Sequence, residues 1–101
     1  MSTRQKEPEV HKLTEEVEQT ARRGEYSNFT KIQHTHLDFR FDFSRIVPEE
    51  GKIYVHTRIF MSPQHAKLFF NALRENIERY EQQFGKIMAQ MENIPPVGEV
   101  H

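Results

Sequence analysis

The chain has 101 residues, with 14 basic and 15 acidic side chains, a net charge of −1 and no cysteine. The lack of cysteine excludes disulfides and thiolate metal sites, and a core this small favours stabilisation by a second subunit. Because charges of both signs are interspersed, we expect no nucleic acid partner and no membrane partner. No apolar run could span a bilayer or serve as a secretory signal, so we expect a cytoplasmic location.

Residues 1–25 predict a charged N-terminal arm. The apolar positions that recur there at helical spacing are Val10, Leu13, Val17 and Ala21. They fit either a short amphipathic helix or an arm without a fixed fold, because four such groups offset little of the entropy lost on ordering. We place the folded domain at residues 26–91 and an extended tail, which contains two adjacent prolines, at residues 92–101.

Two strands are expected first in the folded domain. Residues 29–34 are β-prone but alternate poorly, so they predict an edge strand whose register stays open. The next segment alternates strictly, with apolar Leu37, Phe39, Phe41 and Phe43 between polar Asp38, Arg40, Asp42 and Ser44. Successive side chains of a strand point to opposite faces, so one face should be buried and the other should carry charges.

A turn over residues 46–51 is expected to lead to a third strand over residues 52–61, because Pro48 and Gly51 are disfavoured inside a central strand. One face of this strand is formed by Ile53, Val55, Thr57, Ile59 and Met61. The other face combines aromatic and charged groups, namely Tyr54, His56, Arg58 and Phe60. A mixed face of this kind is typical of a strand that meets a partner, so these four residues and Arg40 form our expected partner-binding surface.

The second and third strands should pair antiparallel, with their apolar sets on one side. This condition restricts the register to steps of two residues. One choice places Phe43 opposite Ile53 and Asp38 opposite Arg58, and the neighbouring choice places Asp38 opposite His56. We favour the first, because opposite charges across a ladder stabilise it and residues 44–52 then form the connecting loop.

A long helix is predicted to start at Ser62-Pro63, since serine caps free amides and proline suits the first helical position. Its apolar residues recur at alternating spacings of four and three, as Ala66, Phe70, Leu73, Ile77, Tyr80, Phe84, Ile87 and Met91. Gly85 is either the end of this helix or a weak point within a longer one.

The helix is expected to be longer than the sheet that could cover it. A helix reaching Met91 would measure about 40 Å at about 1.5 Å per residue, whereas three strands are only about 14 Å wide. The far part of the apolar stripe therefore needs another cover, and a second copy of the chain is the simplest one. We call this part the distal seam, and its residues are Tyr80, Phe84, Ile87 and Met91.

The order of these elements predicts an α+β fold, a three-stranded antiparallel meander followed by one long amphipathic helix (β-β-β-α), in a dimer. The sequence also resembles the prokaryotic domain-of-unknown-function family 3467 over about residues 24–87. The segments that carry the resemblance include Tyr26-Ser27-Asn28, Asp42-Phe43-Ser44-Arg45-Ile46 and, most specifically, Ser62-Pro63-Gln64-His65-Ala66-Lys67. The resemblance implies the fold but no activity, because none is assigned to the family.

Neither a metal site nor a catalytic site is expected. Two of the histidines that could form a zinc shell should lie apart, because His36 falls in a hairpin turn and His65 in the first turn of the helix. Asp38 and Asp42 flank Arg40, which favours ion pairs across the strands over paired acid–base chemistry. We therefore expect no cofactor, no catalytic residue and no enzymatic activity.

A weaker candidate is an anion site at the helix start, formed by Ser62, His65 and Lys67, although a helix start needs no ligand. The leading functional hypothesis is a non-enzymatic homodimeric protein-interaction module with an unidentified protein partner. One alternative is a chaperone-like binder of unfolded or extended peptides, because the predicted architecture resembles that of the secretory chaperone SecB. Another is an anion- or nucleotide-responsive regulator acting through the helix start.

Overall fold

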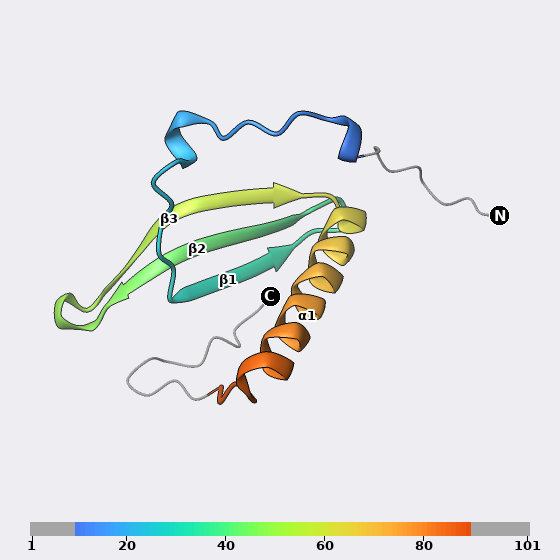
Figure 1. The fold of residues 1–101 in the computed structure, drawn as a ribbon. Helices are drawn as coiled ribbons and strands as arrows, with labels where there is room; N and C mark the ends of the chain where they lie inside the picture. Colours follow the sequence, from blue (N-terminus) through green and yellow to red (C-terminus); the bar gives the residue numbers. More distant parts are fainter. Residues whose placement is uncertain (1–9, 90–101) are drawn as a thin grey trace.

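The computed structural model describes residues 10–89. Figure 1 shows a three-stranded sheet followed by one long helix. The strands are β1 (Phe29–His34), β2 (Phe39–Val47) and β3 (Lys52–Met61), and the helix is α1 (Pro63–Phe84). The sheet order is β1-β2-β3 with both pairs antiparallel, which confirms the predicted β-β-β-α fold.

Strand β1 has the predicted bounds and lies at an edge of the sheet. It connects to β2 through a turn in which the Thr35 hydroxyl accepts hydrogen bonds from the backbone N–H groups of Leu37 and Asp38, at 3.0 and 3.2 Å. Leu37 lies in this turn and is 75% exposed, so its predicted place on the buried face of β2 is wrong. Because of this turn, β2 starts at Phe39, two residues later than the alternation indicated.

The connection between β2 and β3 is shorter than predicted. Ile46 and Val47 continue β2, and only the 3₁₀ turn η3 (Pro48–Glu50) and Gly51 link the strands. Gly51 closes this turn at φ 64°, in the left-handed region that favours glycine. The tight connection fixes the register, which places Asp42 opposite Arg58 and Phe43 opposite Thr57. The antiparallel pairing is confirmed, but both predicted registers are wrong.

A β-bulge at His56 interrupts the pairing of β2 with β3. Phe43 lies opposite Thr57, whereas the next residue, Ser44, lies opposite Val55, so His56 has no partner in the ladder. An extra residue reverses which side chains share a face. From Thr57 onward, the residues of β3 lie on the faces that were predicted for them. Before the bulge, each residue lies on the face opposite to the predicted one.

The side of the sheet that faces α1 carries the hydrophobic contacts. Phe41 packs edge-on against Phe69 of α1, with ring centroids 5.5 Å apart, and stacks on Phe43 at 6.2 Å. Within residues 10–89, the buried hydrophobic side chains are Phe41, on this side of the sheet, and Ile46, on the opposite side. This core is very thin for a domain that must fold alone.

Helix α1 begins as predicted. Ser62 is the N-cap, and its hydroxyl accepts a hydrogen bond from the backbone N–H of His65 at 3.1 Å. The helix ends at Phe84, because Gly85 adopts φ 101°, so Gly85 is the stop and Ile87 lies beyond the helix. With 22 residues, α1 is about 33 Å long at about 1.5 Å per residue.

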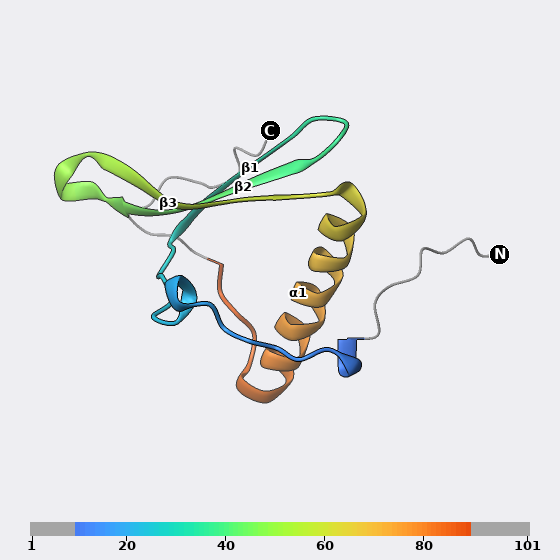
Figure 2. The ribbon, with the colours of Figure 1, turned by 90° about the horizontal axis from the view of Figure 1, so that it is seen from above.

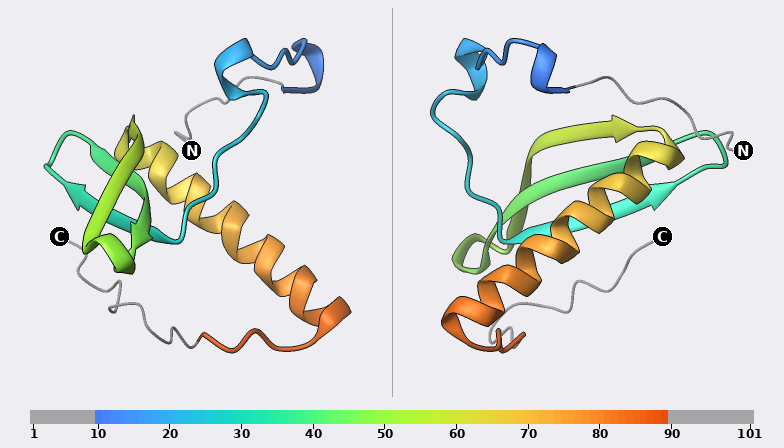
Figure 3. Two further views of the ribbon diagram at one scale, coloured as in Figure 1. Left: turned by 90° about the vertical axis from the view of Figure 1, so that its left-hand side faces the viewer. Right: turned by 45° about the vertical axis from the view of Figure 1, so that its right-hand side comes forward.

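Only the start of α1 lies against the sheet. Figures 2 and 3 show the helix leaving the end of β3 and diverging from the strands along its length. No residue of α1 is buried. The helix therefore presents most of its apolar stripe to solvent in the single chain.

The N-terminal segment contains two 3₁₀ turns, η1 (Val10–Lys12) and η2 (Gln19–Ala21). Val10, Leu13 and Val17 are exposed, and residues 10–25 form no α-helix. Figure 2 shows this segment on the same side of the sheet as α1. The predicted tail, residues 92–101, lies outside the described residues.

Ser27 and Asn28 extend the pairing of β1 with β2 through their side chains. The Ser27 hydroxyl accepts from the backbone N–H of Ser44 at 3.2 Å and lies 3.0 Å from the Ser44 carbonyl oxygen. The Asn28 backbone N–H donates to the same carbonyl oxygen at 3.1 Å, and its Oδ1 accepts from the Ile46 backbone N–H at 2.8 Å. These contacts anchor the end of β2 that carries Ile46.

Asn28→Ala is expected to lower the free energy of unfolding by about 1–2 kcal/mol, because it leaves the Ile46 N–H without its acceptor. Urea denaturation at fixed protein concentration measures the loss. Asn28→Asp, which retains an acceptor oxygen, should cost less than the alanine variant. Equal losses for the two variants would contradict the assigned role of this hydrogen bond.

Candidate functional site

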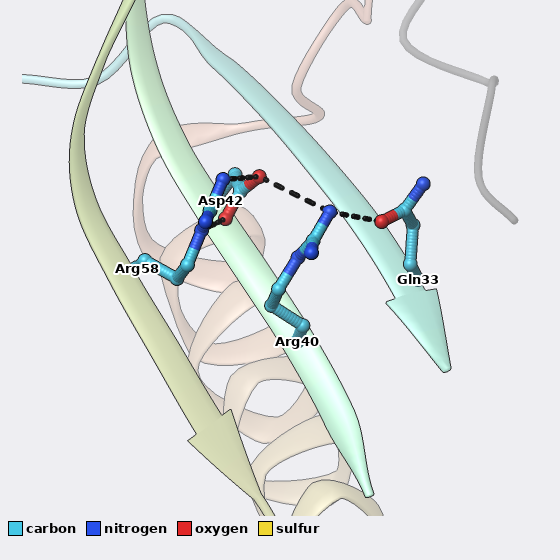
Figure 4. Close-up of polar contacts among 4 residues, drawn as sticks. All are labelled: Gln33, Arg40, Asp42 and Arg58. Carbon is cyan, nitrogen blue, oxygen red and sulfur yellow. Dashed lines mark hydrogen bonds and ion pairs between the residues drawn. The ribbon is translucent and has the colours of Figure 1, made fainter. Parts of the chain in front are cut away.

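The sheet face opposite α1 carries the charged groups, and we call it the outer face. Phe41 points toward α1, so the residues of β2 in the alternate positions, and those paired with them, point away. Figure 4 shows four of these side chains in front of the sheet, with α1 behind it. The outer face is formed by Phe29, Lys31, Gln33, Arg40, Asp42, Ser44, Ile46, Ile53, Val55, Arg58 and Phe60.

Asp42 is the centre of an ion-pair cluster on the outer face. Its carboxylate accepts two hydrogen bonds from the Arg58 guanidinium, at 2.7 Å from Nε and 3.1 Å from Nη2. Asp42 is only 4% exposed, whereas half of the Arg58 side chain is exposed. The hydrogen bonds from Arg58 hold the pKa of Asp42 below its ordinary value, against the opposing effect of desolvation.

Arg40 lies beside this pair without a carboxylate of its own. Its Nη2 is 3.6 Å from Asp42 Oδ2, and it donates a hydrogen bond to the neutral side-chain oxygen of Gln33. Its Nε is buried and has no hydrogen-bond partner among residues 10–89. Two guanidinium groups therefore share one carboxylate, and Arg40 retains unused donors (Figure 4).

A pocket of about 270 Å³ lies next to Arg40. Its lining residues are Gln33, His34, Thr35, Asp38, Arg40 and Phe60. Pockets for drug-sized ligands and cofactors usually measure about 300–1,000 Å³. This pocket therefore suits one side chain or a small polar group better than a cofactor.

The structure brings together only part of the predicted partner-binding surface. Arg40 and Phe60 lie directly opposite each other on the outer face, with Arg58 two residues before Phe60. Tyr54 lies opposite Arg45, on the side of α1, because of the bulge. Its hydroxyl donates a hydrogen bond to the Glu50 carboxylate, which raises the pKa of Tyr54.

His56, at the bulge, is engaged in local hydrogen bonds. Its Nε2 lies 3.0 Å from the Tyr26 carbonyl oxygen and therefore carries the donated proton. In the neutral tautomer, Nδ1 then accepts from the Thr57 hydroxyl at 2.8 Å. His56 therefore links the segment before β1 to β3.

The predicted anion site at the helix start has one side chain already engaged. The Ser62 hydroxyl caps the helix through the His65 backbone N–H. His65 and Lys67 are exposed in the first turns of α1. The geometry is that of an ordinary helix cap.

The distal seam is exposed along the free part of α1. The rings of Tyr80 and Phe84 lie 5.0 Å apart between centroids. Ile87 folds back after the helix, where its backbone N–H donates to the Glu81 carboxylate at 3.0 Å. Together with Ile77, these side chains line a shallow groove of about 540 Å³. Met91 lies outside the described residues.

The described residues contain neither a metal-binding cluster nor a membrane-spanning helix. Within residues 10–89, no group of three or more histidine, aspartate and glutamate side chains is arranged to hold a metal ion. In the same part of the chain, no helix combines the length and the apolarity that a membrane crossing requires.

Sequence reasoning missed the partners of Arg40 and the apolar part of the outer face. Gln33 was not singled out, because the poor alternation of β1 left its face open. Ile53 and Val55 were assigned to the opposite face, because no residue type in β3 marks the bulge at His56. The predicted cross-strand ion pairing is present, but Arg58 pairs with Asp42, and Asp38 contacts the Thr35 hydroxyl in the turn.

Comparisons with known proteins identify a family but no characterised relative. The model of the family described as "Protein of unknown function (DUF3467)" matches residues 1–89. Neither the curated proteins nor the solved structures contain a match to this chain. Since the match covers most of the sequence, the chain belongs to the DUF3467 family.

Proposed function

We propose that the protein is a non-enzymatic homodimeric protein-interaction module, in the cytoplasm of a prokaryotic cell. In this proposal the apolar stripe of α1 joins two copies of the chain, and the outer face of each sheet receives a protein partner. The observation that supports it best is that α1 has no buried residue although its stripe is strongly apolar.

The exposed apolar side chains of α1 supply part of the area that a dimer interface needs. An aromatic side chain carries about 150–250 Å² of surface. Phe70, Tyr80 and Phe84 are 55%, 50% and 66% exposed, so they leave roughly 350 Å² open. Leu73 and Ile77 of the helix and Ile87 beyond its end are exposed aliphatic residues that add to this area.

A specific interface buries about 800 Å² on each partner. The stripe of α1 supplies a large share of this area in one continuous band. Dimerisation through this helix face would then bury the apolar surface that the thin core of the single chain leaves exposed.

Light scattering after size exclusion tests the proposal. We expect the molar mass of a dimer at micromolar concentration, and this molar mass should fall only on strong dilution. A monomer at micromolar concentration with α1 intact by circular dichroism would refute the homodimer.

A second candidate function is the chaperone-like binding of unfolded or extended peptides. The observation that favours it is the set of exposed apolar side chains that the edge strand β3 carries on both sides of Arg58, which we call the apolar strip and which consists of Ile53, Val55 and Phe60. Edge strands can pair with extended chains. A permanently unfolded probe such as reduced, carboxymethylated α-lactalbumin separates the two functions, since a chaperone-like binder should retain it and a specific module should not.

A further inference from the structure

We propose that the pocket beside Arg40 binds a glutamate or aspartate side chain of an extended acidic peptide segment. This inference rests on the proposed function, because it specifies the partner of the outer face. Arg40 would hold the carboxylate, and the apolar strip of β3 would contact the neighbouring side chains of the peptide.

The first step of the inference is the charge of the outer face. Lys31, Arg40 and Arg58 contribute three positive charges, against one negative charge from Asp42. Asp38, which lines the pocket, lowers the balance to a net charge of about +1 but does not pair with Arg40 among residues 10–89. An acidic partner is therefore attracted to this face, and a basic partner is repelled.

The second step is the unused hydrogen-bonding capacity of Arg40. A guanidinium carries five N–H donors in a planar fork that matches a carboxylate. Asp42 accepts two hydrogen bonds from Arg58 and lies 3.6 Å from Arg40 Nη2, whereas the hydrogen bond that Arg40 donates goes to Gln33, a neutral acceptor. The Arg40 Nε is buried and has no acceptor in the described part of the chain, so the guanidinium keeps unsatisfied hydrogen-bonding capacity that a bound carboxylate would help to satisfy.

The third step is the surroundings of the pocket. Its volume of about 270 Å³ accommodates one acidic side chain. Phe60 forms one wall, and the same face of β3 carries Val55 and Ile53 beyond Arg58, all three of these apolar side chains being exposed. Since Phe60 of β3 lies directly opposite Arg40 of the central strand β2, an extended peptide that runs over β3 on the outer face would place a carboxylate at Arg40 and apolar side chains near Phe60, Val55 and Ile53.

Two short capped peptides of matched sequence test the inference. The first is acetyl-Ser-Glu-Val-Glu-Leu-Glu-Ser-amide, and the second has glutamine in place of every glutamate. In NMR titrations of the full chain, the glutamate peptide should shift the Arg40 Nε–H resonance, and the glutamine peptide should leave it in place. Equal shifts with both peptides would overturn the role of the carboxylate.

Variants then locate the site. Arg40→Gln should weaken binding of the glutamate peptide at least about tenfold, because it removes a charge-assisted hydrogen-bond donor. Arg45→Gln is the matched control, since Arg45 is exposed on the other side of the sheet, and it should bind as the parent does. Unchanged affinity in Arg40→Gln would overturn the proposal. If Arg40→Gln fails to fold, the NMR titration of the Arg40 Nε–H resonance in the parent protein tests the proposal instead. Arg40→Lys provides a second variant, and it should also bind the glutamate peptide more weakly than the parent does.

Succinate distinguishes a peptide site from a site for small carboxylates. At the same concentration it should not shift the Arg40 Nε–H resonance, and an equal shift would overturn the assignment to a peptide. Light scattering on the same samples separates this inference from the proposed dimer. A dimer that does not bind the glutamate peptide would refute only the acidic partner. A monomer would refute the homodimer, whether or not it binds the peptide.

Discussion

Phe84→Asp is expected to convert the protein from a dimer into a monomer. Phe84 is the most exposed of the aromatic side chains on α1 and lines the groove of the distal seam. A carboxylate at this position would be buried without a partner in an apolar interface, which is strongly unfavourable. We expect the dimer dissociation constant to rise at least about a hundredfold, measured by analytical ultracentrifugation over a concentration series.

Gln82→Asp is the control for this experiment. It introduces the same charge two positions away, on the exposed opposite side of α1. This variant should remain a dimer with the affinity of the parent. A dimeric Phe84→Asp would show that the distal seam is not the interface, and loss of the dimer in both variants would show that the effect comes from charge alone.

Asp42→Asn is expected to lower the free energy of unfolding by about 1–2 kcal/mol at neutral pH, because it removes the carboxylate that accepts both hydrogen bonds of Arg58. Half of the Arg58 side chain is exposed, so water offsets part of the loss. Urea denaturation at one protein concentration measures the difference, since dimerisation would otherwise change the apparent stability.

The effect of Asp42→Asn should depend on pH. The folded state holds the pKa of Asp42 below its ordinary value of 3.8, mainly through the Arg58 hydrogen bonds, so the ion pair contributes fully above this value. As the pH falls from about 3.8 through the lower pKa of the folded state, Asp42 becomes protonated and the contribution is lost. The parent and the variant should therefore converge in stability at acidic pH.

Glu49→Gln is the matched control, because Glu49 is an exposed carboxylate in η3 without an ion pair among residues 10–89. Its free energy of unfolding should stay within about 0.5 kcal/mol of the parent. A gap between Asp42→Asn and the parent that stays constant down to pH 2 would show that the titration of Asp42 does not carry the effect.

The sequence by itself determined the kinds and order of the elements. Strict alternation identified β2, and the spacing of four and three identified α1, because both patterns report the local geometry of the backbone. The Ser62-Pro63 start of α1 was predicted for the same reason, since a helix cap involves residues only a few positions apart.

The ends of β2 were less predictable. Leu37 fits the alternation of the strand, yet the Thr35 hydroxyl holds it in the turn. Ile46 and Val47 were read as part of a loop because Pro48 follows them, whereas the tight turn at Gly51 allows both to pair with β3. Local propensity cannot settle such ends, because the energy of pairing with another strand decides them.

Only the tertiary structure decided the register of β3, and with it the composition of the outer face. Alternation limits a register to steps of two residues but does not choose among them. The short turn after Val47 and the bulge at His56 set the register. As a result, Val55 lies on the same face as Arg58, and Tyr54 lies on the opposite face. The Asp42–Arg58 pair and the pocket at Arg40 exist because of that choice, since each joins side chains that are distant in the sequence and meet only in the folded sheet.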